Sequence, residues 1–273
     1  MSRLTVQVGG IASPAGISDP ATIVLEDGRI DSIAAGHDRP AHGPLFDARG
    51  EIAGPGLIDV HTHGAGGAQA IDGAADIDTM SRFYAAHGVT GFLASVGGTA
   101  ASIERGLSGV RQTLEGGRGL HEAGSPAGAR CLGAHLEGPF IDPSQPGAFR
   151  PDTIVAPDVA LLEHMIGIAG GSLRLITLAP EQPGAAELIR TARTSGVVCA
   201  AGHSSASAAA MEEAIEHGVS HVTHLFNAMP GFHHRSPGLV GVALSDPRLT
   251  VEVIADGVHL DPRTVRLIAR AKP

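Results

Sequence analysis

The chain has 273 residues, a hydrophobic content of 43% and a formal net charge of −9 at pH 7. This length can bury one large core with a smaller appended unit. The negative charge argues against nucleic acid, because such a partner requires a basic face to neutralise its phosphates. No apolar run approaches the roughly 18 residues of a membrane helix, and the N-terminus MSRLTVQVGG lacks a signal-peptide core. We therefore expect a cytoplasmic protein without a membrane partner.

The numbers and positions of cysteines and histidines indicate which kind of site to expect. Cys131 and Cys199 each lie inside an apolar run typical of a buried strand, so we expect core thiols rather than a disulfide. The 15 histidines exceed what a solvated surface usually needs, and such a count favours a metal site.

The first residues have the pattern of a small β unit. Apolar and polar residues alternate in TVQVGG, ATIVLEDGRIDSIAAG and PLFDARGEI, which predicts an antiparallel β segment over residues 1–53, the N-terminal part of a small β-sandwich. Asp27-Gly28 predicts a hairpin turn. After Gly54-Pro55-Gly56 the rhythm changes, and we expect a second domain over residues 54–273.

Short apolar strands alternate with helical patterns in this second part. The strand candidates are 57–61, 88–95, 131–137, 173–179, 197–203, 221–226 and 250–255. The helix candidates are 76–87, 100–114, 157–169, 184–195, 205–217 and 262–270. This alternation predicts an α/β domain with a parallel sheet built from βαβ units, either an open doubly wound sheet or a closed (β/α)8 barrel. No GxGxxG motif opens a helix after the first strand, which weakens the dinucleotide-binding version.

The positions of polar residues favour the barrel. They fall at or just past the carboxyl ends of different strands, where barrel enzymes place their chemistry. These residues are His61, His63, Glu137, His203, His224, Asp256 and His259. Seven strands are visible, whereas such a barrel has eight, so we expect the eighth strand to be missing from this chain.

Each polar residue also has an ordinary structural interpretation. His61 and His63 point to one face because side chains at i and i+2 of a strand do so, yet they could be satisfied polar residues. Glu137 leaves a buried strand and needs a metal or a cation such as Arg150. His203 or His224 alone would suit a hydrogen-bonded core histidine. Together they supply nitrogen and oxygen donors from four strands, which predicts a divalent metal site for zinc, iron, cobalt or manganese.

Five motifs then indicate a family. PGLIDVHTHG (55–64), HLEGPF (135–140), AGHSSA (201–206), THLFNAM (223–229) with HHRSPG (233–238), and IADGVHLDP (254–262) resemble, in order and spacing, the N-acetylglucosamine-6-phosphate deacetylases of the amidohydrolase superfamily. The resemblance runs from about residue 50 to the end. It implies a metal-dependent (β/α)8 barrel joined to a small β-sandwich, which removes acetate from a phosphorylated amino sugar.

The resemblance also implies roles for single residues. Glu137, His203 and His224 would bind the main ion, and His61 and His63, with Glu137 bridging, a second one. Asn227 and Ala228 would contact the sugar phosphate, Arg235 its phosphate group, and His259 a sugar hydroxyl. An arginine fork suits a phosphate dianion, although Arg235 could also be a solvated loop cation. For Asp256 we expect orientation of the following turn rather than catalysis. His233 and His234 receive no role.

Two residues depart from the family pattern. Phe149 stands where these enzymes commonly have a histidine that contacts the substrate, and Ser236 follows Arg235 where an acidic residue is usual. Phe149 keeps open a deacetylase of another acetylated sugar phosphate, such as N-acetylgalactosamine 6-phosphate.

The end of the chain raises a further alternative. Family members carry a general acid–base aspartate at the end of the eighth strand, and this chain stops at ARAKP, in a helical pattern after the seventh. We therefore expect that aspartate beyond residue 273. A catalytically incomplete metal-binding fragment and a phosphoesterase remain the rival interpretations. For the full-length form we expect a homodimer, because relatives are often dimers and the loop after His224 could reach a neighbour.

Overall fold

The computed structural model describes residues 3–38, 43–116 and 128–272. The chain forms two compact units, Met1–Leu57 and Ile58–Pro273. No helix in the described part of the chain has the length and apolar content needed to span a membrane. The division into domains 1–53 and 54–273 stays a prediction, because compactness alone does not show that each part folds independently.

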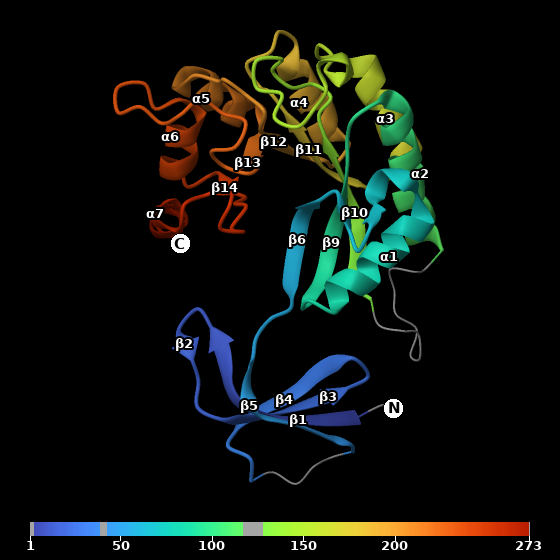
Figure 1. Cartoon of the computed structure of the whole chain (residues 1–273), viewed down its shortest axis with the longest axis vertical. Helices are drawn as coiled ribbons and strands as arrows, with labels where there is room; N and C mark the ends of the chain where they lie inside the picture. Colours follow the sequence, from blue (N-terminus) through green and yellow to red (C-terminus); the bar gives the residue numbers. More distant parts are fainter. Residues whose placement is uncertain (1–2, 39–42, 117–127, 273) are drawn as a thin grey trace. The chain divides into compact units, whose positions relative to one another are not determined.

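The first unit is a five-stranded sheet (Figure 1). Its strands are β1 (Arg3–Ser13), β2 (Gly16–Ile17), β3 (Ala21–Glu26), β4 (Arg29–Ala35) and β5 (Leu45–Ala53). The predicted hairpin turn is confirmed, since Asp27 and Gly28 have φ values of 48° and 77° and connect the antiparallel strands β3 and β4. The expectation of a wholly antiparallel segment is wrong for β5. That strand pairs in parallel with β1, on the edge of β1 opposite β3.

The second unit contains a seven-stranded parallel sheet. Its strands are β6 (Leu57–Thr62), β9 (Val89–Val96), β10 (Arg130–Glu137), β11 (Leu173–Leu178), β12 (Val198–Ala201), β13 (Val219–Val222) and β14 (Thr250–Val251). Their spatial order β6-β9-β10-β11-β12-β13-β14 follows the sequence without reversal. A doubly wound sheet would reverse its order at a switch point, so the sheet is of the barrel type, as predicted. A small hairpin, β7 (Gly64–Ala65) with β8 (Ala68–Gln69), follows β6.

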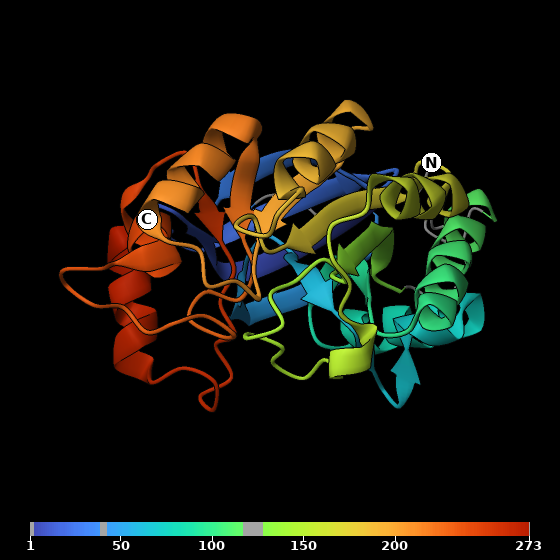
Figure 2. The ribbon, with the colours of Figure 1, turned by 90° about the horizontal axis from the view of Figure 1, so that it is seen from above.

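Helices follow the strands and cover the outer side of the curled sheet (Figure 2). They are α1 (Ala74–Ala85), α2 (Ala100–Glu115), α3 (Val159–Ala169), α4 (Ala185–Thr194), α5 (Ala208–His217), α6 (Gly238–Ser245) and α7 (Pro262–Ala271), with short 3-10 turns η1 (Ala70–Asp72) and η2 (Pro151–Thr153). The sequence prediction missed α6. Side-chain caps explain several starts: Thr99, Asp158 and Ser207 each accept a backbone N–H from the first turn of their helix.

The sheet and the helices enclose one main apolar core. Phe92, Leu136 and Ile176 from three adjacent strands are fully buried in it. Cys131 and Cys199 are buried free thiols, as predicted. Such packing fixes the strand ends, and therefore the polar side chains that follow them, within a rigid frame.

Candidate metal centre

Five predicted ligand residues converge at the carboxyl ends of the strands. His61 lies near the end of β6 and His63 directly after it, while Glu137 is the last residue of β10. His203 follows β12 by two residues, and His224 follows β13 by two residues. The predicted strand 221–226 is therefore too long, because the chain turns after Val222. Two groups of possible metal ligands result, and both contain Glu137.

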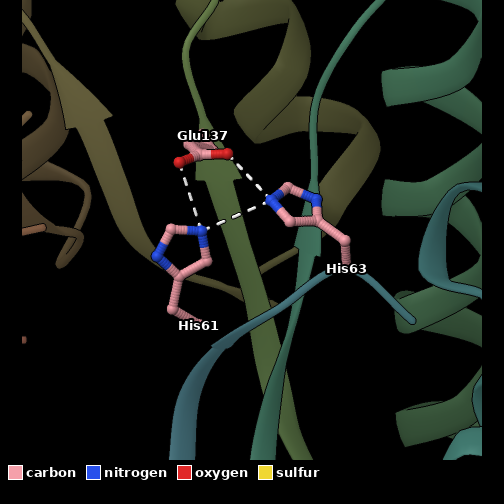
Figure 3. A group of neighbouring side chains, drawn as sticks. All are labelled: His61, His63 and Glu137. Atoms are coloured by element: carbon pink, nitrogen blue, oxygen red, sulfur yellow. Dashed lines mark hydrogen bonds and ion pairs between the residues drawn. The ribbon is translucent and has the colours of Figure 1, made fainter. Parts of the chain in front are cut away.

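The first group, which we call the open group, consists of His61, His63 and Glu137 (Figure 3). Nε2 of His61 lies 3.2 Å from Oε1 of Glu137, and Nε2 of His63 lies 2.8 Å from Oε2. The two Nε2 atoms are 3.3 Å apart. The side chain of His63 is 49% exposed, so this group has a solvent-accessible side.

The second group, which we call the buried group, consists of Glu137, His203 and His224. Both Nε2 atoms lie 3.2 Å from Oε1 of Glu137 and 3.0 Å from each other. Each of the three side chains is less than 10% exposed. Glu137 thus presents its carboxylate to both groups, as a bridging ligand would.

The charges around Glu137 favour the binding of a cation. Burial acts to raise the pKa of Glu137, yet hydrogen bonds with the four imidazoles hold that pKa well below its usual range. Burial acts to lower the pKa of His61, but hydrogen bonds with Glu137 and Glu252 outweigh it and raise that pKa to about 10. Buried carboxylates therefore stabilise a cation here, whether a proton or a metal ion.

The donor set fits a divalent ion. The Nδ1–H of His203 donates to the carbonyl oxygen of Gln145 over 3.0 Å, so Nε2, which faces Glu137, is the nitrogen that a metal ion could take. Nδ1 of His224 is buried, and no described residue offers it a hydrogen bond. Imidazole nitrogens and a carboxylate, without a thiolate, are ligands for borderline divalent metals. The alternative pairing of Glu137 with Arg150 is wrong, since Arg150 pairs with Asp152 at 2.7 Å.

Backbone strain accompanies the buried group. His203 and His224 have φ values of 48° and 29°, and Phe226 and Ala228 in the same turn have 77° and 49°. Residues other than glycine rarely adopt this left-handed region, and it costs of order 1–3 kcal/mol per residue. A Cβ added to Gly147 would lie 2.8 Å from Cε1 of His203. The strained backbone and the close approach of Gly147 therefore occur at the residues that position the two imidazoles.

The predicted substrate residues lie around this centre. Asn227 is half-buried and donates its side-chain amide to the carbonyl oxygen of His224 over 3.2 Å, and Ala228 follows it in the strained turn. Arg235 is exposed and contacts His234 through Nη1 at 3.1 Å. His259 is exposed, and its Nδ1 lies 2.7 Å from Asp256. Their roles toward a substrate stay predictions.

Three further observations concern residues singled out by sequence. Asp256 accepts the backbone N–H groups of Val258 and His259, so its predicted orientation of the turn is confirmed; these bonds lower its pKa to about 2. Phe149 packs edge-on against His203, with ring centroids 5.2 Å apart. Ser236 donates its backbone N–H to His233. The aspartate predicted beyond residue 273 lies outside the chain and stays a prediction.

Sequence reasoning missed a set of polar partners beside the ligands. Glu252 lies 2.9 Å from Nδ1 of His61 and 2.7 Å from Nε2 of His221. His135 is fully buried and connects Ser95 with Thr177. A charged residue in the apolar run TVEVIA is costly unless it is paired, and that cost is the signal that could have identified Glu252.

A parallel sheet in sequential order, outer helices and a His/Glu cluster at the carboxyl strand ends define a barrel-type α/β protein with a candidate metal centre. The model of the Amidohydrolase family matches residues 52–273, so the chain belongs to the amidohydrolase family.

Individual relatives are consistent with the motif resemblance. The chain is 36% identical over 252 residues to N-acetylglucosamine-6-phosphate deacetylase of Bacillus subtilis, covering 91% of this chain and 62% of that protein. It is 33% identical to N-acetylgalactosamine-6-phosphate deacetylase of Escherichia coli O157:H7, covering 91% and 63%. The chain therefore spans less than two thirds of these relatives.

Solved structures show the same fold. The structure of a mutant N-acetyl-D-glucosamine-6-phosphate deacetylase from Mycobacterium smegmatis, in complex with N-acetyl-D-glucosamine-6-phosphate, matches with a TM-score of 0.88 and 28% identity, covering 100% of this chain and 68% of that one. The N-acetylglucosamine-6-phosphate deacetylase from Thermotoga maritima matches with a TM-score of 0.81 and 27% identity, covering 98% and 67%. The predicted fold class is confirmed.

Proposed function

We propose that this chain carries the metal centre and the sugar-phosphate site of an N-acetylglucosamine-6-phosphate deacetylase, which yields glucosamine 6-phosphate and acetate in amino-sugar catabolism. The observation that carries the proposal is the convergence of four imidazoles on the Glu137 carboxylate, directly beside the strained turn that holds Asn227 and Ala228. The Bacillus subtilis relative, named for this activity, supports it.

One or two divalent ions of zinc, iron, cobalt or manganese would be held by the two groups. The buried group would hold the main ion through Glu137, His203 and His224, and the open group a second ion through His61, His63 and Glu137. When bound, such an ion lowers the pKa of a water ligand to about 7 and polarises the amide carbonyl. Burial of Glu137 and His203 keeps bulk water from these donors and strengthens their electrostatic effect.

The polar residues after His224 would bind the phosphorylated amino sugar. The guanidinium of Arg235 has the planar geometry for bidentate contact with a phosphate dianion. None of the described carboxylates forms an ion pair with it, so the charge is available to a ligand. Asn227 and Ala228 would contact the sugar phosphate closer to the metal, and His259 a sugar hydroxyl.

A second candidate substrate is N-acetylgalactosamine 6-phosphate. Phe149 keeps it open, because an apolar ring lies against His203 at a position where deacetylases of this family commonly have a histidine. A changed pocket wall alters which sugar hydroxyl finds a polar partner, and an unpaired polar group opposes binding. The Escherichia coli relative named for the galactosamine substrate supports this candidate.

The test compares three sugars on one metal-loaded preparation. Acetate and inorganic phosphate are measured after incubation with N-acetylglucosamine 6-phosphate, its galactosamine epimer and unphosphorylated N-acetylglucosamine, and binding of each is measured by calorimetry. From a longer form that carries the aspartate expected beyond residue 273, we expect acetate from the glucosamine phosphate and none from the unphosphorylated sugar; from the 273-residue chain we expect binding of the sugar phosphate with little turnover. Arg235→Ala should weaken binding of the sugar phosphate by roughly 10- to 100-fold, the value of a charged hydrogen bond. Arg263→Ala is the control, since Arg263 is an exposed arginine on α7.

The outcomes separate the candidates. Preference for the galactosamine epimer replaces the first substrate with the second. Phosphate release in place of acetate contradicts both and supports a phosphoesterase. If the protein binds metal and sugar phosphate but forms no product, this result supports the catalytically incomplete fragment. The homodimer and the cytoplasmic location remain predictions; the buried free cysteines support the latter.

A further inference from the structure

One buried carboxylate connects the two edges of the parallel sheet. β6 and β14 stand at opposite ends of the strand order, with five strands between them. Glu252 directly follows β14, yet its Oε2 lies 2.9 Å from Nδ1 of His61 at the end of β6. The side chain of Glu252 is 9% exposed. Because the sheet curls, this single carboxylate reaches across its open side.

Three donors fix both oxygens of Glu252. Oε2 also accepts the backbone N–H of His224 over 3.4 Å, and Oε1 lies 2.7 Å from Nε2 of His221. The other ring nitrogen of His221 lies 2.5 Å from Oγ1 of Thr250. No lysine or arginine of the described residues pairs with Glu252. Its charge is therefore directed at imidazoles beside the metal centre.

We propose that Glu252 is a positioning residue for the open group. Its carboxylate accepts the Nδ1–H of His61 and holds that proton on Nδ1, so that Nε2, which faces Glu137, is the nitrogen that would bind an ion. Figure 3 shows that one ring nitrogen of His61 faces Glu137 and His63 while the other faces away. A carboxylate behind a ligating imidazole fixes its tautomer and raises its basicity. This inference rests on the proposed metal centre.

The effect should be confined to one of the two groups. In the buried group, His203 already has a separate partner, the carbonyl oxygen of Gln145. The Glu252 contact with His224 is to its backbone and not to its ring. Loss of the Glu252 carboxylate should therefore weaken the ion held by His61 and His63 by roughly 10- to 100-fold, the usual cost of losing such a partner. The ion of the buried group should keep its affinity.

The experiment is a Co2+ titration of metal-free protein against a competing chelator, with the metal-to-protein ratio measured by elemental analysis after gel filtration. Glu252→Leu removes the acceptor, and Glu252→Gln retains a carbonyl oxygen that can accept from His61. We expect two ions in the wild type, of which the ion of the half-exposed open group is the weaker. Glu252→Leu should weaken binding of that ion by roughly 10- to 100-fold and Glu252→Gln by less. Glu216→Gln is the control for charge, because Glu216 is exposed and pairs with Arg248.

Other outcomes overturn the inference in distinguishable ways. Equal loss for both ions in Glu252→Leu would reduce Glu252 to a structural connection between strand edges. Unchanged affinity for the weaker ion, or binding of only one ion by the wild type, also overturns it. Thermal unfolding without metal shows whether Glu252→Leu folds. If it does not, Glu252→Gln decides: a selective loss of affinity for the weaker ion supports the proposal, and an affinity equal to that of the wild type overturns it. A wild type that binds no Co2+ contradicts the proposed metal centre itself.

Discussion

The open group and the buried group share Glu137 but differ in how the chain holds them. In the buried group both imidazoles are less than 10% exposed, and His203 and His224 themselves have a strained, left-handed backbone. In the open group His61 lies in a regular strand and His63 is 49% exposed. A preformed buried site binds an ion with little reorganisation, whereas an exposed side chain must be ordered first. We therefore expect the buried group to bind its ion more tightly.

The largest effect should come from the residue that both groups share. In Glu137→Gln the carboxylate becomes a neutral amide, whose NH2 group would face the imidazole Nε2 atoms. Each ion should lose more than the roughly 100-fold in affinity that loss of an outer partner costs. Elemental analysis after gel filtration should find neither ion at stoichiometric amounts.

His63→Asn is the matched variant for this experiment. It removes only an imidazole of the open group, so one ion should remain bound with wild-type affinity. Glu104→Gln controls for a lost surface charge, since Glu104 is an exposed partner of His164. Retention of both ions in Glu137→Gln would rule out a shared ligand, and loss of both in His63→Asn would mean that the two groups are not independent.

The second effect acts on the buried group through its packing. Gly147 has a φ of 55°, and a Cβ there would lie 2.8 Å from the ring of His203. Gly147→Ala should lower the free energy of unfolding by about 1–3 kcal/mol, because an alanine is strained in this region and must displace the imidazole. Metal titration should show weaker binding in the buried group alone.

Gly167→Ala provides the comparison for that variant. Gly167 lies within α3, and a Cβ there would meet no atom within 4 Å. Alanine in such a helical position should raise the free energy of unfolding by about 0.5–1 kcal/mol. Chemical denaturation of both variants measures the two effects. Equal stability of Gly147→Ala and the wild type would show that the close approach at His203 is not restrictive.

How much of the fold the sequence could predict depended on whether an element has a recognisable local pattern. Strands such as β9 and β10 are almost continuously buried apolar runs and helices such as α2 have a helical apolar period, so sequence places them within a few residues. α6 contains two glycines and an almost uniformly apolar sequence, GLVGVALS, which has no helical period to detect. β13 appeared too long because Leu225 and Phe226 are apolar, although the backbone there turns through left-handed conformations.

The sequence could predict only those parts of the candidate site that follow from strand order. Ligands of one type at the ends of successive strands must meet when the strands are parallel, so His203 and His224 follow from the pattern. The contact between Glu252 and His61 joins opposite edges of the sheet, and its distance depends on how strongly the sheet curls. No local pattern carries that information, and only the tertiary structure provides it.

The last effect appears only below about pH 6.5 and concerns a neutral histidine beside the open group. The ring of His135 lies 4.5 Å from that of His61 and is fully buried. Oγ of Ser95 accepts the backbone N–H of Thr62, so its own proton can donate to Nδ1 of His135, whose Nε2–H donates to Thr177. Burial, followed by the charge of His61, lowers the pKa of His135 to about 3.

This shift gives a stability profile with a definite sign. Below about pH 6.5 the unfolded chain binds a proton at residue 135 that the folded protein does not bind until about pH 3. The contribution of neutral His135 is therefore fully present above pH 6.5 and falls by up to about 1.4 kcal/mol per pH unit below it. His135→Gln keeps hydrogen-bonding groups for Ser95 and Thr177 but has no proton to gain. Urea unfolding of metal-free protein from pH 7.5 to 4.5 should show the stability of the wild type decreasing relative to the variant; parallel profiles would mean that His135 is protonated in the folded protein.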